Sequence, residues 1–206
     1  RWSGKGAVIL LVDETSLHDK LKVMAVSLVY RGRAIPLAWW CYPPRHWPLG
    51  QVALISTLLH QVAQVLPPGC SVLLQADRGI GNSPELLRAI VKLGWYFLVR
   101  VPGQVRLRLA EGQEVPFASL QRRKGQRWQG KVWAFKKAGL LSCWAVGQWR
   151  KTQQEPWLLL SNWPQAQGNW YSLRMWEESA FKDFKSSGWQ WQDSRVWDAE
   201  HANRLW

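Results

Sequence analysis

The 206-residue sequence predicts a mixed α/β fold with a β-rich insertion, and three observations support this prediction. Continuous runs of Val, Ile and Leu are typical of buried strands. One long segment between such runs repeats its apolar residues at the spacing of an amphipathic helix. A later region consists of short alternating runs separated by basic or glycine-containing turns, which is the pattern of half-buried strands.

The chain opens with three predicted strands. The run Ala7–Val12 is apolar throughout and predicts a buried central strand that stops at Asp13. Two more strand-like runs cover Val23–Tyr30 and Ala34–Tyr42, and Arg31-Gly32-Arg33 between them is suited to a hairpin turn. We expect these strands to form an antiparallel meander.

Two helices and two strands follow. Leu49–Leu66 has helical apolar spacing, and Val72–Ala76 predicts a buried strand that ends at Asp77. Ser83-Pro84-Glu85 supplies an N-cap, a proline at N1 and an acid in the first turn of a helix that ends before Gly94. Trp95–Val101 is the fifth predicted strand.

The order β-β-β-α-β-α-β, a β-rich region and a closing helix matches the ribonuclease-H-like fold. We therefore expect residues 1–101 to form the first part of the core, 102–162 an all-β insertion subdomain, and 163–206 the closing helices. Ser194–Trp206 begins a further helix. Another mixed α+β sheet is the alternative fold.

The composition favours a polyanionic partner. Lys and Arg number 27 against 14 acidic residues, a net charge of +13, which favours nucleic acid first and an anionic membrane second. A basic protein without such a partner remains the alternative. Seventeen tryptophans could include a few that stack on bases, although most belong to the core.

Three widely spaced cysteines indicate neither a disulfide framework nor a zinc site, so we expect a reducing, cytoplasmic compartment. They are Cys41, Cys70 and Cys143. The sequence contains no signal peptide and no apolar run long enough to span a bilayer. It starts at Arg1 without a methionine, so we expect a domain of a longer protein.

Tyr171–Lys185 is predicted as one helix with two opposed faces. Its polar face carries Tyr171, Arg174, Glu178, Lys182 and Lys185. Its apolar face, expected to lie on the core, carries Leu173, Trp176, Ala180 and Phe184. An ordinary solvated face with an Arg174–Glu178 pair at i,i+4 is the simpler interpretation.

Three acids make a metal site the stronger interpretation. In the expected fold Asp13 and Asp77 end neighbouring strands, and Glu178 comes from the helix packed on that sheet. Two such carboxylates repel each other unless cations lie between them. Oxygen ligands suit Mg²⁺ or Mn²⁺, and two hard cations suit displacement at a phosphodiester. Each Asp alone is more often a turn or cap residue.

These residues resemble the catalytic domain of a DDE transposase of the insertion-sequence-four type. Tyr171, Arg174, Glu178 and Lys185 match its Tyr-x2-Arg-x3-Glu-x6-Lys signature, and the first two acids match in VDETS and QADRG. The resemblance covers essentially the whole chain. It implies that Asp13, Asp77 and Glu178 form the metal-binding catalytic triad and hold two Mg²⁺ or Mn²⁺ ions.

The resemblance also implies a DNA-binding set around that triad. Its members are Tyr171, Arg174 and Lys185, which would contact phosphates near the transposon end, together with Lys182, Arg100 and Trp157. Trp157 precedes a Leu-Leu-Leu strand, where relatives stack a Trp on a base flipped from the duplex. Trp157 as one more buried aromatic residue remains the alternative. His18 and His46 are expected to be structural or loop residues.

The implied reaction is cut-and-paste transposition on double-stranded DNA, namely the transposon terminal repeats and a target. Water nicks one strand, the 3′-hydroxyl forms a hairpin on the opposite strand, and the reopened end attacks the target. A homodimer, a bacterial cytoplasmic location and missing N- and C-terminal regions are further implications. A hydrolysis-only nuclease of the same fold, or a non-catalytic nucleic-acid-binding relative, remains the alternative.

Overall fold

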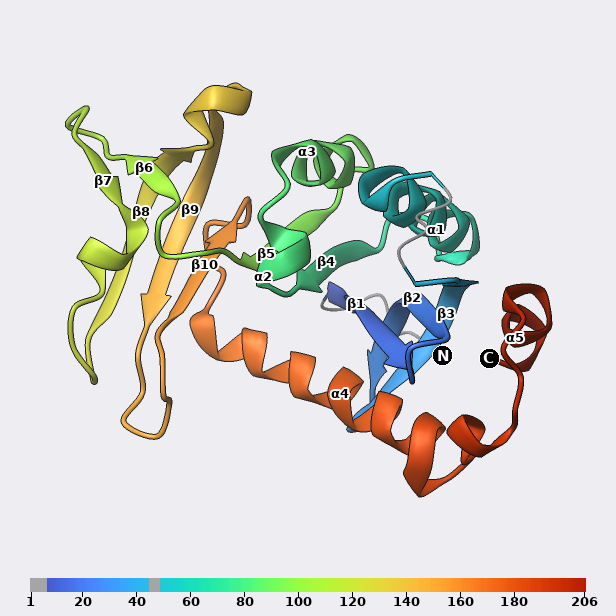
Figure 1. Cartoon of the computed structure of the whole chain (residues 1–206). Coiled ribbons are helices and arrows are strands. Elements are labelled where there is room, and N and C mark those ends of the chain that lie inside the picture. The colour runs from blue at the N-terminus through green and yellow to red at the C-terminus, as the bar shows by residue number, and fades with distance from the viewer. Residues whose placement is uncertain (1–6, 45–48) are drawn as a thin grey trace. The chain divides into compact units, whose positions relative to one another are not determined.

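The computed structural model describes residues 7–44 and 49–206, and His46 lies outside the described residues (Figure 1). The chain divides into two compact units. We call residues up to 73 together with 173–206 the terminal unit, and residues 74–172 the central unit. Strand β4 (Ser71–Ala76) is divided between them.

The terminal unit contains the predicted antiparallel meander, in the order β3-β2-β1. Its strands are β1 (Ala7–Leu17), β2 (Leu21–Tyr30) and β3 (Arg33–Tyr42). Arg31 and Gly32 form the turn between β2 and β3 with φ values of 47° and 81°. Two consecutive positive φ angles match the right-handed twist of the strands, so the predicted hairpin is confirmed.

The predicted end of β1 at Asp13 is wrong. Asp13 pairs with Ala25 in the middle of the β1–β2 ladder, which continues to Leu17 opposite Leu21. The strand persists because Thr15 and Leu17 are buried while Ser16 between them is exposed, a period-2 pattern that extends past the apolar run. Asp13 therefore projects from a strand rather than from a loop.

Three helices of the terminal unit pack against its strands. Helix α1 (Gln51–Val65) contacts β2 and β3, and α4 (Met175–Lys182) and α5 (Ala199–Leu205) contact β3 (Figure 1). Helix α1 confirms the predicted helical spacing. Its buried residues are Leu54, Ile55, Leu58, Leu59 and Val62.

The last residues of the chain are fixed on the same strands. Trp191 and Ala202 belong to a buried cluster with Leu17, Leu21, Val23 and Cys41. The Asn203 carboxamide oxygen accepts a hydrogen bond from the Cys41 backbone N–H at 2.7 Å. The side chain of Asn203 thus takes the place of a neighbouring strand on the β3 edge.

The predicted single helix over 171–185 is three different helical segments. A 3₁₀ segment (Gly168–Arg174) leads into α4, and a π-helical turn (Asp183–Ser187) follows it. The predicted core face is also wrong. Leu173, Trp176, Ala180 and Phe184 are only half-buried, whereas Arg174, Glu177 and Phe181 are buried.

The central unit is built mainly from strands, and it orders them β5-β10-β9-β8-β6-β7, all antiparallel where paired. They are β5 (Tyr96–Arg100), β6 (Arg106–Arg108), β7 (Glu114–Pro116), β8 (Arg127–Ala134), β9 (Leu141–Gln148) and β10 (Trp157–Ser161). The sequence predicts β5 as Trp95–Val101 and a region of short alternating strands where the other five lie.

Two helices of the central unit precede β5. Helix α2 (Arg78–Gly81) is short, and α3 (Pro84–Lys92) has the predicted start. The Ser83 hydroxyl accepts a hydrogen bond from the Leu86 N–H at 3.3 Å, and Gly94 has φ 73° just past the end of α3. The predicted caps of α3 are therefore confirmed.

Each unit contains a sheet flanked by helices, so the chain is a mixed α/β protein compatible with the ribonuclease-H-like class. The division into a core and an insertion at 102–162 stays a prediction. No helix among residues 7–44 and 49–206 is both long enough and apolar enough to cross a bilayer.

Two substitutions in α1 test its packing. Leu58 is fully buried, so Leu58→Ala should lower the free energy of unfolding by about 2–5 kcal/mol through lost burial and the cavity that remains. Val65, in the same helix, is 72% exposed, and Val65→Ala should change stability by less than about 0.5 kcal/mol. Urea denaturation followed by circular dichroism measures both, and equal losses would contradict the packing of α1.

Candidate active site

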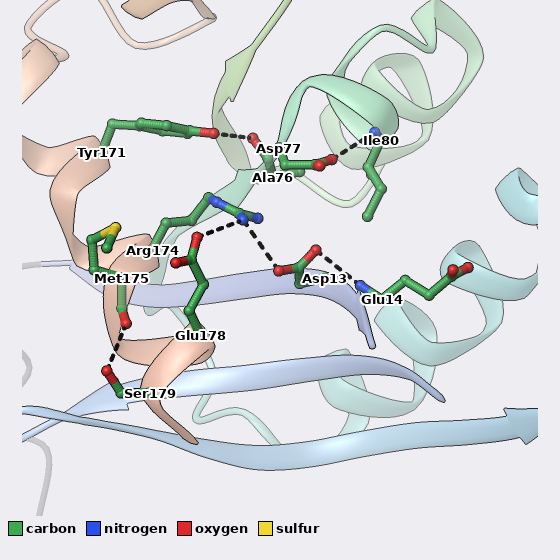
Figure 2. Close-up of polar contacts among 10 residues, drawn as sticks. All are labelled: Asp13, Glu14, Ala76, Asp77, Ile80, Tyr171, Arg174, Met175, Glu178 and Ser179. Carbon is green, nitrogen blue, oxygen red and sulfur yellow. Dashed lines mark hydrogen bonds and ion pairs between the residues drawn. The ribbon is translucent and has the colours of Figure 1, made fainter. Parts of the chain in front are cut away.

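The candidate site of the terminal unit begins at Asp13 in β1. One carboxylate oxygen of Asp13 accepts a hydrogen bond from the Glu14 backbone N–H at 2.9 Å. The other accepts one from Nη2 of Arg174 at 3.1 Å (Figure 2). The Asp13 side chain is only 14% exposed, so this ion pair lies in a region of limited hydration.

Arg174 links Asp13 to the third predicted acid. Its Nη2 also lies 3.6 Å from a carboxylate oxygen of Glu178, one helical turn further on (Figure 2). The whole Arg174 residue is 8% exposed, whereas the Glu178 side chain is 53% exposed. The predicted i,i+4 pair is thus present, but its guanidinium points inward to β1 instead of lying on a solvated face.

A pocket of about 420 Å³ opens beside these groups. Three acids line it, namely Asp13, Glu14 and Glu178. Lys182 and Lys185 line it as well, so carboxylates and ammonium groups share one opening. The structure therefore brings together four of the predicted site residues with Arg174 beside them.

The π-helical turn sets the position of Lys185. A π turn inserts an extra residue into a helix and recurs at functional sites. Partial burial lowers the pKa of Lys185 below its usual range, and the negative charge of Asp13 acts in the opposite direction. Lys185 therefore lies within electrostatic reach of Asp13.

Glu14 is a site residue that the sequence analysis missed. Its carboxylate accepts a hydrogen bond from the Tyr42 hydroxyl at 2.6 Å and forms an ion pair with Lys22. Burial, together with the Glu14 carboxylate, raises the pKa of Tyr42 well above its usual range. The only sequence signal was the adjacency of Glu14 to Asp13, and it is the cross-strand partners that hold Glu14 at the pocket.

Asp77 belongs to the central unit, where it caps a helix. Its carboxylate accepts a hydrogen bond from the Ile80 N–H at 2.9 Å and so caps α2 (Figure 2). This is the ordinary role of an Asp that follows a strand. Its approach to Asp13 and Glu178 stays a prediction.

Tyr171 and Trp157 also lie in the central unit, in contact with each other. The Tyr171 hydroxyl donates a hydrogen bond to the Ala76 carbonyl at 3.3 Å (Figure 2). The rings of Trp157 and Tyr171 pack edge to face with centroids 5.3 Å apart, and the guanidinium of Arg150 lies 5.8 Å from the Trp157 ring centre. Trp157 is thus half-buried between a phenol and a cation.

Arg100 ends β5 and is paired within its own unit. Its Nη2 donates to the Glu155 carboxylate at 2.6 Å and to the Pro156 carbonyl at 3.2 Å. Arg78 lies 3.3 Å from the same carboxylate, and the hydrogen bond from Arg100 is the main reason that the pKa of Glu155 is lowered. A phosphate would have to compete with Glu155 for Arg100.

The carboxylate oxygens of Asp13 and Glu178 are chemically suited to a hard divalent cation. The guanidinium of Arg174 already lies between these two acids, so such a cation would meet a positive charge there. Within the described residues, no three His, Cys, Asp or Glu side chains gather closely enough to hold a metal ion. The terminal unit thus supplies two candidate ligands.

The chain is thus a mixed α/β protein with acids and lysines around one pocket of its terminal unit. The chain belongs to the transposase DDE domain family, which matches residues 51–206. Glu178 and Asp77 lie inside the matched range, and Asp13 precedes it. The family is described as the DDE domain of transposases.

Two further comparisons cover curated proteins and solved structures. No curated protein matches the chain. Among solved structures, the Argonaute of Aquifex aeolicus is similar over 77% of this chain at 10% identity, with a TM-score of 0.34. The match spans 22% of the Argonaute chain.

The electrostatic effect of Asp13 on Lys185 predicts a change in the pKa of Lys185. Asp13→Asn removes the negative charge that raises the pKa of Lys185 and leaves the burial that lowers it, so this pKa should fall further. Titration of the Lys185 side chain by NMR measures the change. Asp19→Asn, in the exposed β1–β2 turn, is the matched control, and an equal effect from both variants would contradict a specific effect of Asp13 on Lys185.

Proposed function

We propose that this chain is the catalytic domain of a cut-and-paste DDE transposase of the insertion-sequence-four type. It cleaves DNA strands at transposon ends and transfers the freed ends to target DNA. Asp13, Asp77 and Glu178 act as its catalytic carboxylates. Tyr171, Arg174, Lys182, Lys185, Arg100 and Trp157 contact the DNA.

The observation that best supports this proposal is the ion-pair cluster at Arg174. Asp13 and Arg174 are 161 residues apart in the sequence and lie 3.1 Å apart in the fold. Glu178 shares the same guanidinium, and Lys182 and Lys185 line the pocket with both acids. A chance solvated helix face would not bury its arginine against a strand carboxylate.

Asp13 and Glu178, joined by Asp77, would hold two Mg²⁺ or Mn²⁺ ions, which the carboxylate donor set fits. When bound, such ions supply activation of the attacking oxygen and stabilisation of the leaving oxygen at a phosphodiester. Arg174 holds the two acids of the terminal unit in place before DNA arrives. A carboxylate pair without that compensation would repel.

The basic residues bind the strand around the reacting phosphate. Lys182 and Lys185 at the pocket lie where their ammonium groups can pair with phosphate oxygens. The partial burial of Lys185 strengthens such a pair because less water screens it. Trp157 stacks on a base near the cleavage point, which relieves a sharply bent strand.

The reaction has two parts. Hydrolysis of one phosphodiester breaks its bond to the bridging 3′ oxygen, which leaves as a 3′-hydroxyl. That hydroxyl then attacks a phosphodiester of the target, forms a new bond to phosphorus and releases a target 3′-hydroxyl. We further propose that the active complex is a homodimer in the bacterial cytoplasm.

Replacing Glu178 tests the catalytic role. Glu178→Gln should reduce strand cleavage of a transposon-end duplex by more than about a hundredfold, because an amide is a poor ligand for a hard cation. DNA binding should stay within about twofold. Cleavage in Mn²⁺ is measured on denaturing gels, and added target DNA separates strand transfer from hydrolysis alone.

Glu200→Gln is the matched control, since Glu200 is an exposed helical acid paired with an arginine four residues on, as Glu178 is four residues from Arg174. It should leave cleavage unchanged. Cleavage by Glu178→Gln at the control rate would remove Glu178 from the site. Hydrolysis without transfer would favour a nuclease of the same fold.

Metal binding tests whether Asp77 joins the other acids. Calorimetric titration of Mn²⁺ with a duplex present should give a binding heat that Asp77→Asn abolishes. Asn caps a helix as well as Asp does, so α2 should be retained in this variant. Asp19→Asn is the control for the loss of one charge, and an unchanged heat in Asp77→Asn would separate Asp77 from the metal ligands.

A further inference from the structure

A second, larger pocket lies in the central unit, between the ends of β8 and β9 and the segment 167–169. Its volume is about 570 Å³, within the range of roughly 300–1,000 Å³ that ligand sites occupy. We call it the β8–β9 pocket. The lining residues used below are Arg127, Gln129, Gln148, Arg150 and Asn169.

The chemistry of this lining is cationic and amide-rich. Arg127 and Arg150 carry its charge, and no acid is among the described residues that line it. Two guanidinium groups without a lining carboxylate favour an anion, above all a phosphate that each can bind through two N–H groups. Four carboxamide residues also line it, namely Gln129, Gln148, Gln167 and Asn169, and carboxamides can donate to and accept from the edge of a base.

Arg150 connects the pocket to Trp157. When the Gln148 carboxamide is turned so that its oxygen faces Arg150, that oxygen accepts hydrogen bonds from Nη2 of Arg150 at 3.2 Å and from Nε of Arg150. The same guanidinium lies over the Trp157 ring, 5.8 Å from its centre. A strand that reaches Trp157 therefore meets Arg150, and beyond Arg150 lies the β8–β9 pocket.

Gly168 lies directly against the Gln148 side chain. A Cβ at Gly168 would crowd the Gln148 carboxamide, so a larger residue there would force Gln148 to move. The Trp128 ring lies on the other face of β8, over Gly130 and edge to face against Phe117. The face of β8 that meets the pocket carries the side chains of Arg127 and Gln129, opposite Gln148 of β9.

We propose that the β8–β9 pocket binds one unpaired nucleotide of a DNA strand, with its phosphate on Arg127 and Arg150. Its base lies within reach of the Gln129 and Asn169 carboxamides. The choice of DNA as the ligand rests on the proposed function. The site itself is separate from the carboxylate pocket and needs no metal.

The test compares two fluorescent probes without divalent metal. One is a blunt DNA duplex, and the other is the same duplex with a three-nucleotide single-stranded overhang. Fluorescence anisotropy at several salt concentrations gives affinity and its salt dependence. The wild-type chain should bind the overhang probe more tightly than the blunt one.

Arg127→Ala and Arg150→Ala should each weaken binding of the overhang probe about tenfold, the cost of losing a charged hydrogen-bonding partner. The salt slope should fall by about 0.7 for each lost single-strand phosphate contact. Binding of the blunt duplex should change much less. Gln129→Ala should weaken overhang binding with an unchanged salt slope, since it removes a base contact only.

Arg108→Ala is the matched control, because Arg108 also lies over a tryptophan, 5.3 Å from the Trp133 ring centre, and does not line the pocket. It should change binding of both probes by less than about twofold. If Arg108→Ala weakens overhang binding as much as Arg150→Ala, the proposal is overturned in favour of a diffuse basic surface. Equal wild-type affinity for both probes overturns it as well.

The outcome is separable from that of the proposed function. Glu178→Gln should leave the overhang preference intact, since it alters only the terminal unit. If the chain prefers the overhang probe, loses that preference in Arg127→Ala and never cleaves DNA, the proposed nucleotide site is supported and the proposed catalytic function is wrong. If the chain cleaves DNA but shows no overhang preference, the catalytic function is supported and the nucleotide site is wrong.

Discussion

The terminal unit depends on one buried guanidinium. Arg174 is 8% exposed and binds Asp13 of β1 at 3.1 Å and Glu178 of α4 at 3.6 Å. Burying an arginine is costly unless charged partners meet it, and removing one partner leaves an uncompensated charge. The rotation of α4 about its own axis is therefore constrained by Asp13. That rotation in turn directs Lys182 to the pocket and Phe181 to the core.

The central unit differs in that it presents positive charge on its sheet. Its arginines are held by aromatic rings and carbonyl or carboxylate oxygens. Arg108 lies over Trp133, Arg150 lies over Trp157, and Arg100 is bonded to Glu155. A stacked arginine has already lost part of its rotamer freedom, so less entropy is lost when a phosphate binds. This accounts for part of the unusual tryptophan content.

Local patterns predicted much of the fold. Three strands, the Arg31-Gly32 turn, α1 and the caps of α3 all follow from interactions within one turn or one strand pair. The same patterns failed at the signature helix. Its apolar spacing favoured a core face through Leu173 and Trp176. The hydrogen bond between Arg174 and Asp13 instead turns a neighbouring face of the helix to the core.

The sequence by itself determined the strand and helix order, the excess of positive charge and the spacing of the family signature. Only the tertiary structure decided that Asp13 lies inside β1, that Glu14 joins the pocket through Tyr42, and that Arg127 and Arg150 line one cavity. The reason is physical. Propensity and periodicity reflect neighbours close in the chain, whereas an ion pair across 161 residues depends on how packed elements are rotated against each other.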